Sequence, residues 1–267
     1  MRLGTVAVTG AAGNIGAVVR RALQSEATRV ILLDRVTLRP EADNEDVHTI
    51  DLRDAAAVES ALAGADQVLH LGGMPDEAPL EDLLDVNVLG THHVLEAARR
   101  TGIERVVLAS SNRVAGFYPI GHFTRPQEPV RPDGLYGVSK AAIEALGQLY
   151  ADKFGLSVIC LRIGSFEPVP TEPRHLATWL SPRDAVGYVR AALTAPSSTR
   201  FATVYAVSAN TRRFWEVPDS AVLDYTPVDN AECHAVDVPG AELPADPTSP
   251  QAGPYASPEF TLPHLRS

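Results

Sequence analysis

The sequence predicts an α/β protein with a doubly wound parallel sheet of the Rossmann type and helices on both faces. Short runs rich in β-branched residues alternate with longer helical patterns along most of the chain. These runs do not alternate apolar and polar residues, so both of their faces should be buried. A glycine-rich stretch, VTGAAGNIG (8–16), follows the first run and opens a helix, which is the context of a dinucleotide-binding turn.

The expected elements follow in a regular order. We predict strands at 5–10, 28–34, 47–51, 66–73, 104–111 and 156–164, and helices at 14–25, 54–64, 80–102 and 134–155. Asp54 suits an N-cap, and Gly102 and Gly155 suit C-caps.

After Gly164 the chain is rich in proline, apart from a predicted helix at 181–195 and a strand at 202–209. We expect one Rossmann-type domain over 1–267, with 1–164 mainly a dinucleotide-binding core. Residues 165–267 should mainly form a small substrate-binding lobe and a C-terminal segment.

Composition excludes several classes of function. The formal net charge of −10 argues against nucleic-acid binding. The two cysteines, Cys160 and Cys233, form no metal or redox motif, so we expect no metal. The sequence shows no signal peptide and no apolar run of the ~18 residues that span a bilayer. We therefore predict a cytoplasmic protein that does not bind membranes.

The glycine-rich turn predicts where a dinucleotide binds. Gly10, Gly13 and Gly16 permit a tight turn, a close approach to the pyrophosphate and close helix packing, while Asn14 and Ile15 begin the helix whose amides face the phosphates. Asp34 ends the second strand, where a carboxylate binds the ribose of NAD, although the adjacent Arg35 could instead meet the 2′-phosphate of NADP. Asp51 ends the third strand and contacts the adenine or simply starts a helix.

Tyr136 and Lys140 lie four residues apart in PDGLYGVSKAAIEA (132–145). That spacing puts both side chains on one helix face, and a nearby ammonium group lowers the pKa of a phenol. Since many ordinary helices contain the same spacing, the stretch alone does not distinguish a catalytic pair from a structural one. Ser111 ends a strand at the carboxyl edge of the sheet, where ligands bind in this fold.

Taken together, these motifs resemble the extended short-chain dehydrogenase/reductases of the NAD-dependent epimerase/dehydratase family. The resemblance includes HLGG (70–73), Asn87, SSN (110–112) and YGVSK (136–140), in order and on the expected elements. SSNRVAGFYP (110–119), RIGSFEPVP (162–170), LATWLSPRD (176–184) and SANTRRFW (208–215) extend it to the uronate dehydrogenases over nearly all of the chain.

The resemblance implies NAD-dependent oxidation at C1 of cyclic D-galacturonate or D-glucuronate to an aldarolactone. Tyr136 would be the acid/base, Lys140 its partner and Ser111 the group that orients the substrate. The implied cofactor-binding residues add Leu52, Leu71, Gly72, Gly73 and Asn87, and the implied substrate-binding residues are Ser111, Asn112, Arg113, Ser165, Arg174 and Tyr255. Arg174 would grip the carboxylate and Tyr255 would lie over the sugar.

Two residues depart from the family pattern. Arg113 replaces a common histidine and either shares in binding the carboxylate or forms a salt bridge with a nearby acid. Pro75 replaces a common serine, so the preferred sugar acid stays open. Asn87 supports Lys140 through a water or the backbone, or is simply a buried structural residue.

Other functions also fit this fold. A nucleotide-sugar epimerase or dehydratase, or another sugar dehydrogenase, would share it, but the short C-terminal region argues against a sugar-nucleotide substrate. A non-catalytic NAD-binding sensor would be free to lose Ser111, Tyr136 and Lys140. By analogy with enzymes of this fold, we expect a homo-oligomer that pairs through the helices at 80–102 and 134–155.

Overall fold

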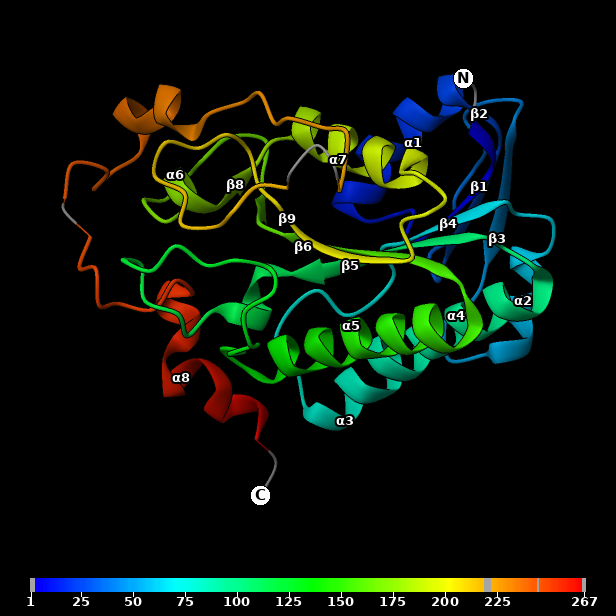
Figure 1. The fold of residues 1–267 in the computed structure, drawn as a ribbon, viewed down its shortest axis with the longest axis horizontal. Coiled ribbons are helices and arrows are strands. Elements are labelled where there is room, and N and C mark those ends of the chain that lie inside the picture. Colours follow the sequence, from blue (N-terminus) through cyan, green and yellow to red (C-terminus); the bar gives the residue numbers. More distant parts are fainter. Residues whose placement is uncertain (1–2, 219–221, 244, 266–267) are drawn as a thin grey trace.

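The computed structural model describes residues 3–218, 222–243 and 245–265. Its centre is a sheet of seven parallel strands in the order β3-β2-β1-β4-β5-β6-β9 (Figure 1). The strands are β1 (Leu3–Thr9), β2 (Ala27–Asp34), β3 (Glu45–Thr49), β4 (Gln67–His70), β5 (Arg105–Ser111), β6 (Ser157–Ile163) and β9 (Phe201–Ala206). The order changes direction between β1 and β4, and ligands bind beside such a point in this fold.

Helices cover both faces of the sheet, as predicted. On one face lie α1 (Asn14–Glu26) and α7 (Pro182–Thr194), and on the other lie α2 (Ala55–Leu62), α4 (Gly90–Thr101) and α5 (Leu135–Phe154) (Figure 1). Neighbouring residues of one strand serve opposite faces, so that Val106 and Leu108 pack in one core cluster and Val107 in the other. This explains why the central strands are largely apolar rather than alternating.

The predicted caps are confirmed. The Asp54 carboxylate accepts from the Ala57 amide, and Gly102 and Gly155 adopt φ of 79° and 74° at the ends of α4 and α5. The predicted helix at 80–102 is continuous but is not α-helical throughout. A π-helical turn, η1 (Leu84–Leu89), lies between α3 (Leu80–Leu83) and α4.

The second part of the chain does not stay apart from the sheet. Two short strands, β7 (Ser165–Phe166) and β8 (Trp179–Leu180), pair in a separate small sheet, and the short helix α6 (His175–Thr178) lies between them in the chain. The chain then returns through α7 and β9 to the main sheet. Residues 165–218 therefore complete the core as well as forming a lobe.

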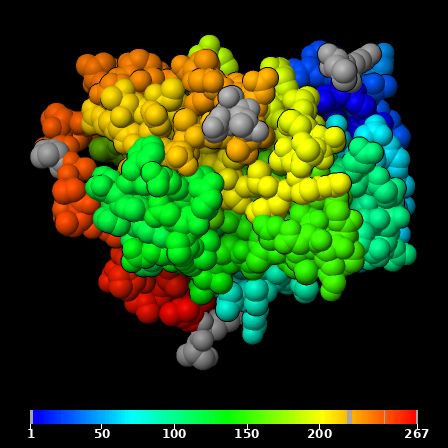
Figure 2. Space-filling model, in the orientation of Figure 1, coloured from blue at the N-terminus to red at the C-terminus, as the bar shows by residue number. Residues whose placement is uncertain are grey.

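The C-terminal part runs back over the carboxyl edge of the sheet. It contains η3 (Ala231–Asp237), η4 (Gly253–Ala256), α8 (Pro258–Thr261) and η5 (Leu262–His264), and it packs near η2 (Asn112–Ala115). Backbone bonds from Ile120 to Ser249 and from Gln251 to Tyr118, both 2.8 Å, join it to the loop after β5. In Figure 2 its red surface lies next to the green surface of that region. None of the described helices combines the length and apolar character that crossing a membrane requires.

Candidate active site

The glycine-rich loop is packed against the end of β4. Gly10 has a φ of 68°, and a Cβ atom there would lie 2.6 Å from the Gly72 nitrogen. A Cβ atom at Gly16 would lie 2.5 Å from the Gly10 carbonyl oxygen. The loop therefore brings the turn after β1 and the HLGG stretch after β4 into direct contact, with no room for side chains at either glycine.

The start of α1 suits an anion. Gly13 is the N-cap and offers no side-chain cap, and the first turn, which begins with Asn14 and Ile15, contains no acidic residue. The amides of that turn can therefore donate to a phosphate group. The Asp34 carboxylate lies beside this loop and accepts from the Ala12 amide at 2.9 Å. The expected pyrophosphate and ribose positions are thus neighbours.

Asp51 and Leu52, the residues expected at the adenine end of the cofactor site, make contacts within the protein. The Asp51 carboxylate is paired with Arg53 at 2.6 Å, which lowers its pKa to about 2. Leu52 lies against Gly72 and Gly90, where added Cβ atoms would be 2.8 and 3.0 Å from its side chain. Leu52 therefore packs beneath the loop after β4, while a contact between Asp51 and adenine stays a prediction.

Asn87 holds the loop that continues from Leu71, Gly72 and Gly73. Its side-chain oxygen accepts from the Met74 amide at 2.7 Å, and its amide group donates to the Met74 carbonyl and to the Ser139 hydroxyl. A Cβ atom at Gly73 would lie 2.7 Å from that side-chain oxygen. Asn87 thus acts as a buried structural residue with backbone contacts, and it is linked to α5 through the Ser139 hydroxyl, which donates to the Tyr136 carbonyl.

The three candidate catalytic side chains come together at the carboxyl edge of the sheet. The Ser111 hydroxyl is close enough to Tyr136 to favour its phenolate and so to lower its pKa against the effect of burial. The Lys140 ammonium lies 5.6 Å from the centre of the Tyr136 ring and donates to the Ala109 carbonyl at 2.8 Å. All three side chains are more than nine-tenths buried. The serine, the tyrosine and the lysine thus form one constellation built from β5 and α5.

One electrostatic expectation is wrong in this structure. Burial raises the pKa of Tyr136 to about 12, despite the opposing effects of Ser111 and Arg113, and burial lowers the pKa of Lys140 to about 8. The predicted lowering of the Tyr136 pKa is therefore not observed, because burial of the phenol outweighs Ser111 and Arg113, the groups that favour the phenolate.

The catalytic helix is capped from a distant part of the chain. The Glu77 carboxylate accepts from the amides of Leu135 and Tyr136 at 2.8 and 3.2 Å. A Cβ atom at Gly134 would lie 2.5 Å from that carboxylate, and one at Gly137 would lie 2.5 Å from the Arg113 carbonyl. The glycines that flank Tyr136 therefore allow the helix to start close to both partners.

Arg174 faces the site from the segment after β7. Its guanidinium donates to the Gln251 carbonyl at 2.9 Å and to the Ser165 hydroxyl at 3.3 Å, and it lies 5.4 Å from the Tyr255 ring centre. Burial lowers its pKa, and no carboxylate forms a salt bridge with it within the described part of the chain. The structure thus brings Ser165, Arg174 and Tyr255 together, as predicted, around a cation that has no acidic partner there.

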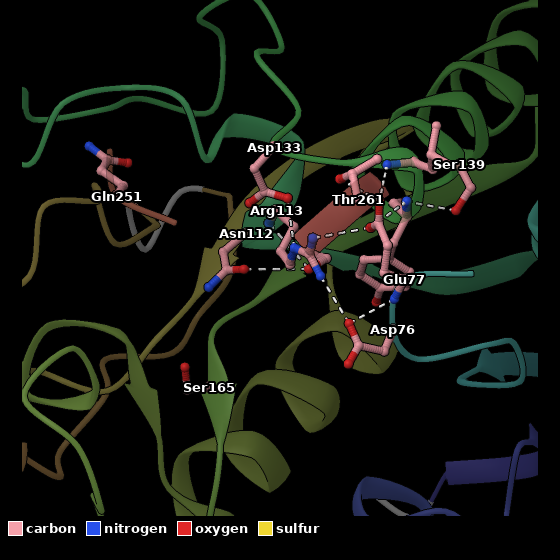
Figure 3. A network of polar contacts seen from close by, with 12 residues as sticks. Asp76, Glu77, Asn112, Arg113, Asp133, Ser139, Ser165, Gln251 and Thr261 are labelled. Atoms are coloured by element: carbon pink, nitrogen blue, oxygen red, sulfur yellow. Dashed lines mark hydrogen bonds and ion pairs between the residues drawn. The ribbon is translucent and has the colours of Figure 1, made fainter. Parts of the chain in front are cut away.

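Arg113 is engaged by acids, which confirms the salt-bridge alternative. Its guanidinium lies between three carboxylates, those of Asp133 at 2.6 Å, Asp76 at 3.1 Å and Glu77 at 3.2 Å (Figure 3). Shared binding of a substrate carboxylate is thus not supported by its contacts. The neighbouring Asn112 is buried and accepts from the Ser111 hydroxyl at 3.4 Å, while Pro75 is exposed beside Asp76.

Sequence reasoning missed several members of this site. Asp133 precedes α5 and resembles a helix cap, yet it holds Arg113. Glu77 provides the cap from 58 residues away. Gln251 is almost wholly buried, and its side chain bonds to Trp215 and Thr124. No local pattern marks these three residues, because their partners are distant in sequence.

Comparison with known proteins agrees with this geometry. The model of the NAD dependent epimerase/dehydratase family matches residues 6–186. The uronate dehydrogenases of Agrobacterium fabrum and Pseudomonas syringae pv. tomato are 41% and 38% identical to this chain, each over 90% of it and over 90% and 87% of their own lengths.

Solved structures agree as well. The crystal structure of uronate dehydrogenase from Agrobacterium tumefaciens has a TM-score of 0.90 and 39% identity, covering 98% of this chain and 100% of that one. A variant of that enzyme with a tyrosine changed to alanine, complexed with NAD, has the same TM-score and covers 97% of this chain and 99% of that one. The chain therefore belongs to the NAD dependent epimerase/dehydratase family, in the part of it that contains the uronate dehydrogenases.

Proposed function

We propose that this protein oxidises the C1 hydroxyl of a cyclic hexuronic acid, D-galacturonate or D-glucuronate, to an aldarolactone with NAD⁺ as the oxidant. The observation that carries this proposal is Arg174, a partly buried guanidinium without an acidic partner in the described chain. Arg174 is connected to the Ser-Tyr-Lys constellation through the Tyr255 ring and Arg113, which lies 5.4 Å from the Tyr136 ring centre. A guanidinium recognises a carboxylate through two parallel hydrogen bonds. The relatives reported above act on uronates, which supports the same substrate class here.

The cofactor fits the residues that are present. Gly10, Gly13, Asn14, Ile15 and Gly16 would hold the pyrophosphate and Asp34 the ribose, and bound NAD⁺ would supply the hydride acceptor. A carboxylate at position 34 repels a 2′-phosphate, so we propose NAD rather than NADP, with Arg35 as the source of any residual NADP use. Leu71, Gly72, Gly73 and Asn87 form the opposite wall, with Asp51 and Leu52 at the adenine end.

The chain's own residues would handle the proton. Ser111 would hold the C1 hydroxyl, and the Tyr136 oxygen would take its proton as the C1 hydrogen leaves with its electron pair, so that C1 becomes the lactone carbonyl. Since burial raises the pKa of Tyr136 to about 12, efficient proton removal at neutral pH depends on positive charge near the phenol. Within the described chain, two cations lie near the phenol, Lys140 at 5.6 Å and Arg113 at 5.4 Å from the Tyr136 ring centre, and Lys140 would be the partner of Tyr136 in the reaction. Asn112, Ser165 and Arg174 would bind the rest of the sugar.

We also propose which part of the chain binds each ligand, and how two copies of the chain pair. Residues 1–164 carry the cofactor site and the three catalytic groups, while 165–267 supply Ser165, Arg174 and Tyr255. Leu84, Leu89 and Val138 are 39%, 48% and 42% exposed on neighbouring helical turns, which supports pairing of two copies through η1 and α5. A cytoplasmic location stays a prediction.

The test is a spectrophotometric panel. NAD⁺ and NADP⁺ are each offered with galacturonate, glucuronate, mannuronate, the matching neutral aldoses and glucose 6-phosphate. Formation of NADH with uronates supports the proposal. Activity confined to neutral sugars would exclude a carboxylate-binding role for Arg174, and activity confined to glucose 6-phosphate would identify a different anionic substrate. An assay with sugar nucleotides separates the epimerase and dehydratase alternatives, and tight NAD binding without any turnover would indicate a sensor.

A further inference from the structure

The C-terminal segment, residues 253–265, contacts the site mainly through Arg113. The guanidinium carbon of Arg113 lies 4.7 Å from the Tyr255 ring centre and 5.0 Å from the Phe260 ring centre. The two rings meet edge to face at 4.9 Å. Planar guanidinium groups stack well on aromatic faces, so these contacts hold two side chains of the segment on one cation.

Tyr255 connects the two arginines of the site. Its ring centre lies 4.7 Å from the Arg113 guanidinium carbon and 5.4 Å from that of Arg174. The Arg174 guanidinium is also bonded to the Gln251 carbonyl, just before the segment begins. Any displacement of Tyr255 would therefore change the surroundings of the cation that we assign to the substrate carboxylate.

Glu77 joins the same segment to the catalytic helix. Its carboxylate accepts a hydrogen bond from the Thr261 hydroxyl at 3.0 Å (Figure 3). The same carboxylate accepts from the Leu135 and Tyr136 amides and from the Arg113 guanidinium. The segment is thus attached at one end by the buried Gln251 and at the other by Thr261, with Tyr255 and Phe260 on Arg113 between them.

The acids around Arg113 argue against a direct role in reading the substrate's charge. Three carboxyl groups lie within 3.2 Å of one guanidinium whose side chain is only 8% exposed. A substrate carboxylate approaching this group would meet like charges that are already in contact with it. Arg113 is therefore fully engaged in holding protein groups.

We infer that Arg113 is a positioning residue that fixes residues 253–265 as one wall of the sugar site, and that its charge does not recognise the substrate carboxylate. This inference rests on the proposed function only for the identity of the ligand. It predicts that weakening Arg113 harms the binding of charged and uncharged sugars alike, whereas weakening Arg174 harms charged sugars selectively.

The first experiment compares Arg113→Lys, Tyr255→Leu and the double variant. Lysine keeps one positive charge among the three carboxylates, so the fold is retained, but it lacks the flat face that stacks on the rings. We expect KM to rise about tenfold for galacturonate and by the same factor for galacturonamide, in which an amide replaces the carboxylate. The double variant should be no worse than the more affected single variant, because both changes release the same wall.

Arg99→Lys is the matched control. Arg99 also stacks on a ring, that of Phe154 at 5.3 Å, and pairs with Glu96, but it lies on the exposed face of α4. This control should leave KM for both sugars unchanged. A loss in Arg113→Lys that affects galacturonate and spares galacturonamide would overturn the inference, as would losses that simply multiply in the double variant.

Hydrogen exchange tests the contact without any assumption about the reaction. In Arg113→Lys, the amides of 253–262 should exchange at least about tenfold faster, while those of β1 and β5 keep their rates. Unchanged exchange in 253–262 would overturn the inference even if activity fell. If the unaltered protein oxidises no sugar, the proposed function fails, and the exchange result still decides whether Arg113 holds the segment.

Discussion

Changing Arg174 to glutamine removes the charge that we assign to the substrate carboxylate while keeping a side chain that can form hydrogen bonds. The existing bonds from Arg174 to the Gln251 carbonyl and the Ser165 hydroxyl show that two of its nitrogens already serve the protein. The remaining edge of the guanidinium has no acidic partner in the described chain. We therefore expect the variant to fold and to lose mainly the interaction with a ligand's negative charge.

The size of the effect follows from the bonds that are lost. A hydrogen bond to a charged group is worth about 1.5–3 kcal/mol, and a carboxylate bound through two such bonds on a partly exposed arginine should lose about 3 kcal/mol. This corresponds to a fall of about a hundredfold or more in kcat/KM. Arg174→Lys keeps the charge but not the planar pair of donors, so its kcat/KM should lie between that of Arg174→Gln and that of the unaltered protein.

The assay measures NADH formation with galacturonate and with galacturonamide under the same conditions. The ratio of the two kcat/KM values reports recognition of the carboxylate separately from any general damage to the site. We expect Arg174→Gln to reduce this ratio by about a hundredfold and to leave kcat/KM for galacturonamide nearly unchanged. An equal fall for both sugars would refute the reasoning, because Arg174 would then shape the site rather than bind the charge.

Three further predictions concern other parts of the site. Tyr136→Phe should lower turnover by ~100-fold or more while the affinity for NAD stays near normal, and unchanged turnover would remove Tyr136 from the mechanism. Asp34→Asn should raise KM for NAD⁺ about tenfold and reduce the preference over NADP⁺, whereas an unaltered preference in initial-rate assays would leave Arg35 as the selective residue. Burial raises the pKa of Asp133 to about 6 from an ordinary value of 3.8. Between about pH 4 and 6 the folded state therefore binds more protons than the unfolded state. The free energy of unfolding should accordingly fall as the pH rises through that window. Asp133→Asn should remove this slope, worth up to about 3 kcal/mol, and denaturation at several pH values that shows equal slopes would contradict the assignment.

Local patterns predicted the framework of this protein. The glycines of the first turn, the apolar strands, the capped helices and the four-residue spacing of Tyr136 and Lys140 all depend on neighbours in sequence or on backbone geometry. Each was therefore readable without knowledge of the tertiary structure, and the predicted parallel sheet placed Ser111 at the same edge as the phosphate loop. The resemblance of the motifs added Ser165, Arg174 and Tyr255, which the structure places side by side.

The tertiary structure decided the electrostatics and the outer wall of the site. Arg113 could bind a substrate or a protein acid as far as the sequence shows, and the choice depends on Asp76 and Glu77, 37 and 36 residues away. The cap of the catalytic helix comes from Glu77 rather than from the adjacent Asp133, and the pKa of Tyr136 is set by burial rather than by the lysine one turn along. The sequence alone determined which groups are available. Which charges meet, and how much water surrounds them, depends on segments that come together only when the chain folds, because electrostatic energies are set by distance and burial in space and not by separation along the chain.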